Sequence, residues 1–333
     1  MTGIERLCDP AARRSYGPLS GGAPYLLLDC REAAAAAAEF AAVKTALGDW
    51  PCPIIAIAAD TSMPLATCAD AVVDGPEAAE PLLANIRRHP IAATVLVQLL
   101  RLIDGLPVAQ ALAAESLANS TLQAGPEFAR WLGGHRASKT LVARDIGPAV
   151  LMRRGGADGG TLHLTLNRPG LRNAMTVEMR DALVEALELA LADTSIRRVE
   201  IDGAGKCFST GGDLGEFGSA PDPASAHCVR SLALPARLLT QMAARVRVRV
   251  HGACIGSGIE VAAFAGHLVA APGAWFQLPE LSLGLIPGAG GCVSIARRIG
   301  RQRCAWLVLS GVRLNARTAM EWGLVDAIEP QAA

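Results

Sequence analysis

The stretch that decides the fold is HGACIGSGIEVAAFAG, residues 251–266, in which Glu260 lies among apolar and glycine residues. A lone glutamate is more often a solvated surface charge or the partner of a helix dipole. Here the flanks are almost wholly apolar, and a charge in such surroundings needs a partner or a function. The glycines would also let backbone N–H groups approach a bound molecule closely. Glu260 is therefore a candidate catalytic residue.

A second glutamate has a similar setting. Glu280 lies in FQLPELSLGLIPGAGG, residues 276–291, after a proline and before another glycine-rich turn. Two carboxylates can hold one water molecule or one substrate proton between them, which is the arrangement that general acid/base chemistry requires. The sequence thus predicts that Glu260 and Glu280 act together.

Composition narrows the class of protein. The chain has 333 residues, of which 51% are hydrophobic and 19% charged, with a formal net charge of zero. These values indicate a compact protein with a sizeable core and two structural units. The neutral balance argues against nucleic acid or an anionic membrane as a partner, because both call for a basic face. Arginines at 245, 247 and 249 alternate with valines, which predicts a strand with one polar face.

Other ligand classes find little support in the sequence. The nine cysteines are scattered without a C-x-x-C pair and the six histidines are dispersed, so we expect neither a disulfide framework nor a metal site. No apolar run reaches about 18 residues, and the first residues lack the apolar centre of a signal peptide. We therefore expect a cytoplasmic protein with no membrane contact.

The periodicity of the C-terminal half is that of an α/β protein. Strands separated by helices imply crossover connections, a largely parallel sheet and ligands near the carboxyl ends of strands. The predicted strands are residues 162–166, 198–202 and 246–250. The predicted helices are residues 176–192 and 224–244.

The N-terminal half is organised differently. Two strands, residues 25–29 and 54–58, flank an alanine-rich helix at residues 31–47, and everything from residue 77 looks helical. The helices there are predicted at residues 77–87, 91–102, 107–123 and 126–132. We expect four parts: an α/β remnant at 1–74, a helical segment at 75–136, a linker with an edge strand at 137–160, and the catalytic core at 161–333.

Four glycine-containing segments occur in an order that resembles the enoyl-CoA hydratase/isomerase (crotonase) superfamily, over roughly residues 149–330. They are LTLNRPGLRNAM (164–175), KCFSTGGDLGEF (206–217), HGACIGSGIEVA (251–262) and FQLPELSLGLIPGAGG (276–291), the last followed by GRQRCAWLVLSGVRLNARTAMEWGLVDAI (300–328). The resemblance implies a crotonase-like spiral of ββα units in the C-terminal half, preceded by a partly helical N-terminal region.

The resemblance also implies a mechanism. Backbone N–H groups of Gly212 and Ser257 would polarise the thioester carbonyl of an acyl-CoA substrate, Glu260 would be the base that orients water, and Glu280 the acid that protonates the α carbon. Coenzyme A would be part of the substrate, with no bound cofactor. Ser257 replaces a more usual glycine, and Cys292 stands where threonine is common. Substrate and CoA contacts are expected from Arg172, Thr210, Gly211, Asp213, Leu214 and Gly256.

The expected activity is hydration of a 2-enoyl-CoA in fatty acid metabolism, by a homo-oligomer (a trimer or hexamer). Two alternatives stay open. A double-bond isomerase needs only one carboxylate, and a non-catalytic subunit that binds CoA esters would explain the unusual N-terminal half. Retention of both glutamates favours hydration, but fold alone does not decide among these functions.

The order of the segments is unusual for the superfamily. Its members normally continue after the "GLVD" motif with a helical tail that covers the active site and builds trimers, whereas this chain ends soon after that motif. Residues 74–136 resemble such a tail, and residues 25–74 resemble the collapsed remnant of a first copy without counterparts of Glu260 and Glu280. We expect the helices of this segment to dock on a core, with Arg130 or Arg136 near a CoA phosphate.

Overall fold

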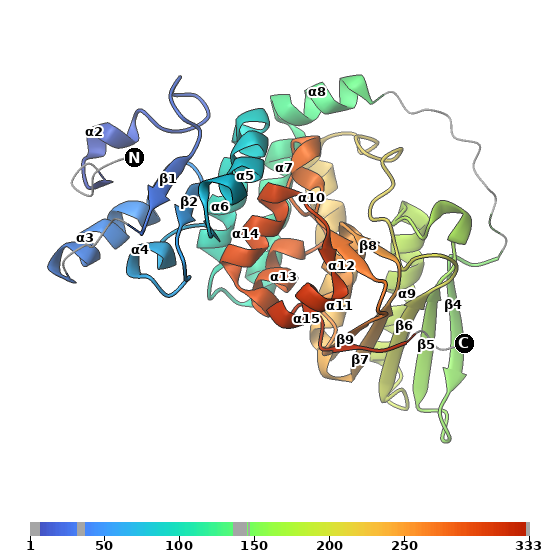
Figure 1. Ribbon diagram of the computed structural model, residues 1–333. Helices are drawn as coiled ribbons and strands as arrows, with labels where there is room; N and C mark the ends of the chain where they lie inside the picture. Colours follow the sequence, from blue (N-terminus) through green and yellow to red (C-terminus); the bar gives the residue numbers. More distant parts are fainter. Residues whose placement is uncertain (1–6, 32–36, 136–144, 146, 331–333) are drawn as a thin grey trace.

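A six-stranded sheet lies at the end of the molecule opposite the N-terminal unit (Figure 1). The structure is a computed structural model that describes residues 7–31, 37–135, 145 and 147–330. All neighbouring strands of this sheet are parallel except β4 and β5, so β4 is an antiparallel edge strand. In spatial order the strands are β12 (Ala327–Ile328), β9 (His267–Ala270), β7 (Val246–Val250), β6 (Arg198–Gly203), β5 (Thr161–Leu166) and β4 (Val150–Gly155).

A smaller sheet and several helices complete the C-terminal half. The small sheet has the order β11 (Leu314–Asn315), β10 (Trp275–Gln277) and β8 (Ala253–Ile255). The longer helices are α9 (Val177–Ala192), α10 (Pro223–Leu232), α11 (Pro235–Met242), α13 (Gly291–Ile299), α14 (Arg301–Ser310) and α15 (Ala316–Trp322). The short ones are η1 (Pro169–Leu171), η2 (Ala243–Arg245), α12 (Ser257–Ala262) and η3 (Glu280–Leu283).

Local sequence explains most of these elements. β5 and β7 alternate between buried and partly exposed side chains, as the period-2 pattern predicts. α9 begins after Thr176, whose side chain accepts a hydrogen bond from the Met179 N–H and so caps the helix. The prediction of one helix at residues 224–244 was wrong. The chain turns between α10 and α11, because Pro235 cannot continue a helix and instead begins the next one.

The N-terminal unit is a three-stranded parallel sheet with its own hydrophobic core. Its strands are β1 (Leu26–Asp29), β2 (Ile54–Ile57) and β3 (Ala71–Val73), and its helices are α2 (Pro10–Arg13), α3 (Ala37–Gly48) and α4 (Pro64–Thr67). The first part of the predicted helix at 31–47 lies outside the described residues, and α3 ends near the predicted boundary. The sequence does not predict β3, because three residues are too few to show a period.

Four helices join the N-terminal unit to the core. They are α5 (Pro76–Arg88), α6 (Pro90–Ile103), α7 (Val108–Gln123) and α8 (Pro126–Gly134), close to their predicted bounds. α5 and α6 pack on α14, α7 packs on α13 and α10, and α8 packs on η3. Leu96 and Leu112 share one hydrophobic cluster with Val308 of α14. Leu102 of α6 and Leu117 of α7 lie outside this cluster and are 63% and 55% exposed.

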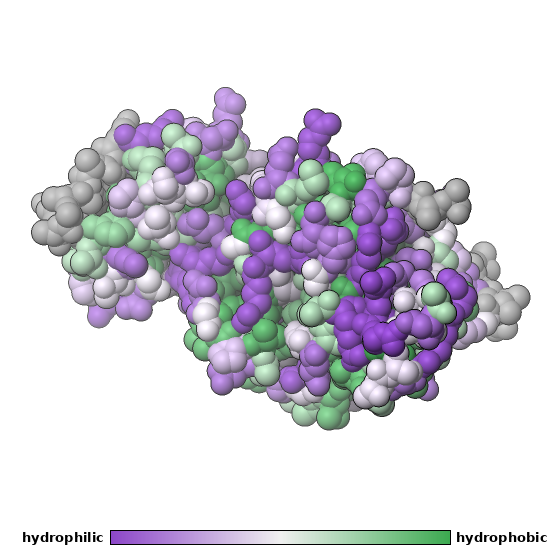
Figure 2. Space-filling model, turned by 90° about the horizontal axis from the view of Figure 1, so that it is seen from below, coloured by the Kyte–Doolittle hydropathy of each residue, from purple (hydrophilic) through white to green (hydrophobic). Residues whose placement is uncertain are grey.

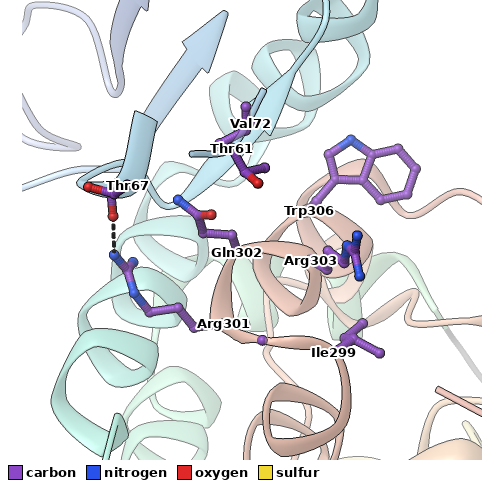
Figure 3. Close-up of a pocket in the computed structure, with 9 residues that line it drawn as sticks. Thr61, Thr67, Val72, Ile299, Arg301, Gln302, Arg303 and Trp306 are labelled. Carbon is purple, nitrogen blue, oxygen red and sulfur yellow. Dashed lines mark hydrogen bonds between the residues drawn. The ribbon is translucent and has the colours of Figure 1, made fainter. Parts of the chain in front are cut away.

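The N-terminal unit contacts the core through polar groups as well as through β3. Asp70, which is 2% exposed, forms ion pairs with Arg101 of α6 and Arg301 of α14. A cavity of about 350 Å³ lies at this junction, where Arg301 donates a hydrogen bond to the Thr67 carbonyl (Figure 3). Gln302 donates there to two further carbonyls of the N-terminal unit. These contacts fix the unit on α14.

The surface carries no continuous apolar band on the face seen in Figure 2, where hydrophilic and hydrophobic side chains are interspersed. Among the described residues, no helix has both the length and the apolar character needed to cross a membrane. Nine residues of the predicted linker, 137–144 and 146, lie outside the described residues, and so does Arg136.

Candidate active site

Glu260 lies on α12, which begins immediately after a sharp turn at Gly256. Gly256 has φ +49°, and a Cβ atom there would lie 2.7 Å from Oε1 of Glu280. Only glycine satisfies both the backbone angle and the space. The turn therefore lets the two glutamates approach the same region, and Glu260 itself is 2% exposed.

The carboxylate of Glu260 is held by the glycine-rich turn before α13. Its Oε2 atom accepts hydrogen bonds from the Ala289 N–H (2.7 Å) and the Gly291 N–H (3.0 Å). A Cβ atom at Gly291 would lie 2.5 Å from the Glu260 Cγ atom, so this turn is shaped around the glutamate. Burial raises the pKa of Glu260 to about 7, although the backbone N–H groups of the turn act in the opposite direction.

Glu280 is the first residue of η3 and is 8% exposed. Its Oε2 atom is buried and has no hydrogen-bond partner among the described residues. Burial raises the pKa of Glu280 well above its usual value, and the neighbouring charge of Glu260 adds to the shift. Burial thus favours the protonated form of Glu280, which can donate a proton, whereas the pKa of Glu260 lies at about 7.

A third buried glutamate, Glu115 of α7, is not among the residues that the sequence predicted for the site. It is 1% exposed and accepts hydrogen bonds from the Gly290 N–H (2.7 Å) and the Cys292 N–H (2.8 Å). Burial raises the pKa of Glu115 well above its usual value, with a further contribution from the charge of Glu260. A signal was present: Glu115 also lies among small and apolar residues, the argument that singled out Glu260.

Gly212 and Ser257 line the same cavity as both predicted catalytic glutamates, with a volume of about 210 Å³. Among the described residues, neither the Gly212 N–H nor the Ser257 N–H has a hydrogen-bond acceptor. Gly211, with φ +87°, brings this loop close to β8, since a Cβ atom there would lie 2.9 Å from the Ile255 carbonyl oxygen. The Ser257 hydroxyl is buried without a partner in the described structure.

The other residues predicted to contact substrate lie outside the described cavity lining. Arg172 and Leu214 are exposed, and the Asp213 carboxylate accepts a hydrogen bond from the Gly215 N–H (2.9 Å). Three of the predicted residues lie one or two positions along the chain from residues of the cavity lining, and they affect the course of the backbone there: Thr210, Gly211 and Gly256. The structure thus brings together the four proposed catalytic residues but not this second group.

The cavity wall comes from both halves of the chain. α7 contributes Asn119 and Gln123, the chain around α10 and α11 contributes Arg230, Leu234 and Pro235, and the segment after Glu280 contributes Leu285 and Ile286. Asn119 also donates a hydrogen bond to the Ile286 carbonyl oxygen (2.8 Å), so it ties the two sides together. The described residues hold no group of three or more His, Cys, Asp or Glu side chains suited to a metal ion.

Residues 156–333 match the family described as enoyl-CoA hydratase/isomerase. The chain belongs to this family. The match covers the whole of the four-segment region, and it confirms the resemblance inferred from the sequence. It begins after α7, so Glu115, Asn119 and Gln123 belong to a part of the chain that the family match does not cover.

Individual members of the enoyl-CoA hydratase/isomerase family agree with this assignment. The chain is 38% identical to the 2,3-dehydroadipyl-CoA hydratase of Escherichia coli over 51% of its own length and 66% of that protein. It is 32% identical to the trans-2-decenoyl-[acyl-carrier-protein] isomerase of Streptococcus mutans, over 52% of this chain and 68% of the isomerase. The chain therefore spans about two thirds of the length of these relatives.

Solved structures of the family confirm the predicted crotonase-like α/β fold. The crystal structure of enoyl-CoA hydratase from Thermoplasma volcanium superimposes with a TM-score of 0.51 at 33% identity. That superposition covers 56% of this chain and 73% of the hydratase. The likeness thus concerns about half of this chain.

Proposed function

We propose that this protein adds water to the double bond of a 2-enoyl-CoA. The observation that carries the proposal is that two buried glutamates share one cavity with two backbone N–H groups that have no acceptor among the described residues. Burial raises the pKa of Glu260 to about 7 and that of Glu280 well above its usual value. A carboxylate with a pKa near neutral pH suits a general base, and a carboxyl group whose protonated form is favoured by burial suits a general acid.

In the proposed mechanism, the thioester carbonyl oxygen accepts hydrogen bonds from the Gly212 and Ser257 N–H groups. These donors stabilise the negative charge that develops on the oxygen, and loss of one such donor typically lowers kcat by about 10²–10³. The Glu260 carboxylate takes a proton from water as the water oxygen bonds to the β carbon. Glu280 donates its proton to the α carbon, so the product gains the elements of one water molecule.

Double-bond isomerisation is the second candidate, and the 32% identity to the isomerase of S. mutans favours it. Isomerisation moves a proton between two carbons and needs only one carboxylate. Retention of both Glu260 and Glu280 favours hydration, and so does the 38% identity to a 2,3-dehydroadipyl-CoA hydratase.

We further propose that α5–α8 do the work of the helical tail that other family members carry after the core. Two observations support this proposal. The helices pack on α13, α14 and η3 of the same chain, and α7 supplies Asn119 and Gln123 to the cavity. A contact of Arg130 with a CoA phosphate stays a prediction.

The test is a panel of 2-enoyl-CoA and 3-enoyl-CoA esters incubated with the purified protein and followed by mass spectrometry. Hydration adds the mass of one water molecule, whereas isomerisation leaves the mass unchanged and alters the chromatographic retention. Unchanged esters across the panel, despite measurable binding, would favour the non-catalytic alternative.

A further inference from the structure

Arg230 extends from α10 toward the cavity and is held in place by α7. Its Nε atom donates a hydrogen bond to the Ser116 Oγ atom (3.0 Å), and its Nη2 atom donates to the Ser116 carbonyl and the Ser120 hydroxyl. The Ser116 hydroxyl also contacts Nδ1 of His227 (2.9 Å), and the Ser120 hydroxyl donates to the Pro223 carbonyl. The guanidinium group is thus fixed by several partners, each of them uncharged.

Arg230 has no carboxylate within the ion-pair distance of 4.0 Å in the described structure, and its Nη1 atom has no hydrogen-bond acceptor there. Arg245 is also half-buried without an ion pair among the described residues, but its guanidinium group donates to two backbone carbonyls and does not line the cavity. Arg101, Arg168 and Arg298 have side chains that are 14%, 7% and 13% exposed, and each pairs with an aspartate or glutamate. Burial lowers the pKa of Arg230, although the charge of Glu115 acts in the opposite direction from beyond ion-pair distance. A half-buried guanidinium group without a carboxylate in direct contact is costly, and arginine stays protonated at physiological pH.

A carboxylate in direct contact with Arg230 has a place to bind. Arg230 lines the cavity that contains Glu260 and Glu280, together with the polar side chains of Gln123 and Arg180. Arg180 differs from Arg230 because it is already paired with Asp181 (2.6 Å). The volume of about 210 Å³ lies below the roughly 300–1,000 Å³ of common ligand pockets, so the cavity suits a short acyl group better than the CoA nucleotide.

We propose that Arg230 binds a carboxylate at the far end of the acyl chain, so that the substrates are CoA esters of short dicarboxylic acids. This inference rests on the proposed function for the orientation of the thioester. The two N–H bonds of Nη1 would donate to the carboxylate, and the serines of α7 hold the guanidinium group ready for it. Charge-assisted hydrogen bonds of this kind are among the strong ones in proteins.

The experiment measures binding, so it does not depend on turnover. Dissociation constants are determined by calorimetry for hexanedioyl-CoA and hexanoyl-CoA, two saturated esters that differ in the terminal carboxylate. We expect the wild-type protein to bind the dicarboxylic ester at least about 10-fold more tightly. Arg230→Gln should abolish this preference while the affinity for hexanoyl-CoA changes less than about threefold.

Two further variants sharpen the outcome. Arg230→Lys keeps the charge and should retain part of the preference for hexanedioyl-CoA over hexanoyl-CoA. Arg180→Gln removes an arginine that is already paired with Asp181, so this variant should retain most of the preference. Equal affinities of the wild-type protein for the two esters would overturn the inference even if Arg230→Gln fails to fold. Loss of the preference in Arg180→Gln alone would also overturn it. A strong preference without hydration of any enoyl ester would instead contradict the proposed function.

Discussion

Glu115 and Glu260 accept hydrogen bonds from alternate backbone N–H groups of one turn, residues 289–292. Glu260 takes the first and third of these groups, and Glu115 takes the second and fourth. The two carboxylates therefore hold the same turn between them. Glu115 comes from α7, so a helix of the N-terminal half helps to fix the position of the proposed catalytic base.

Replacement of Glu115 should therefore affect both stability and catalysis. Glu115→Gln keeps the size of the side chain but offers only one acceptor atom, so one buried N–H group loses its partner. An unsatisfied buried donor costs about 1–3 kcal/mol. We expect a lower melting temperature and a kcat reduced by about 10-fold, with KM nearly unchanged because Glu115 does not line the cavity.

The matched control for Glu115 is Glu185→Gln, since Glu185 is an exposed glutamate on α9. This substitution should leave the melting temperature and kcat unchanged. If the two variants behave alike, Glu115 does not position the turn.

The proposed acid and base should each be required for turnover. We expect Glu260→Gln and Glu280→Gln to lower kcat by at least about 10², while the affinity for a saturated acyl-CoA stays nearly intact. Steady-state kinetics with the best ester of the panel and calorimetry with its saturated analogue give the two numbers. Full activity of Glu260→Gln would exclude a mechanism that uses both carboxylates.

The rate should depend on pH in a direction set by burial. The raised pKa of Glu260, about 7, keeps its carboxyl group protonated to a higher pH than an exposed glutamate would be. A base must be deprotonated, so kcat/KM should fall as the pH drops below about 7, rather than near the ordinary value of 4.5. The pH at the midpoint of this change in kcat/KM reflects the interacting glutamates together, because their titrations are coupled. In Glu260→Gln the residual activity should lose this dependence, and a rate independent of pH between 5 and 8 in the wild type would contradict the assignment.

The sequence predicted those features that local pattern controls. Thr176 marks the start of α9 through its cap, and alternation locates β5 and β7. Glu260 and Glu280 stood out because each has an apolar, glycine-rich setting within a short segment. Glu115 has a similar setting, but its partners lie 175 and 177 positions away in the chain. Nothing in the pattern around Arg230 indicates Ser116, 114 positions earlier. Contacts of this kind become visible only when the helices are placed.

Two substitutions of Ser257 distinguish the role of its backbone N–H group from the role of its side-chain hydroxyl. Its hydroxyl has no partner in the described structure, so Ser257→Ala should retain most activity. Ser257→Pro removes the N–H group that the mechanism requires. Ser257 is the first residue of α12, where a helix tolerates proline, so we expect a folded protein with kcat lowered by at least about 10². Equal damage from alanine and proline, at equal melting temperatures, would assign a role to the hydroxyl.

Removal of residues 1–144 should leave a core that cannot function alone. The deletion uncovers the faces of α13 and α14 that α5–α7 bury, including apolar side chains such as Val308. It also removes Glu115 and two residues of the cavity wall. We expect the truncated protein to be insoluble or inactive, whereas the full chain is soluble and active under the same conditions.

Restoring the deleted segment tests whether the helices act by docking. Residues 1–144, produced as a separate chain, should restore solubility and part of the activity, because the contacts to α13 and α14 are noncovalent and need no linker. The matched control is the same segment carrying Leu96→Asp and Leu112→Asp, which places charges in the apolar face that meets the core. Rescue by the wild-type segment alone would support the role of α5–α8 as a substitute tail. A truncated protein that is well folded and fully active by itself would show that the N-terminal half is an independent module.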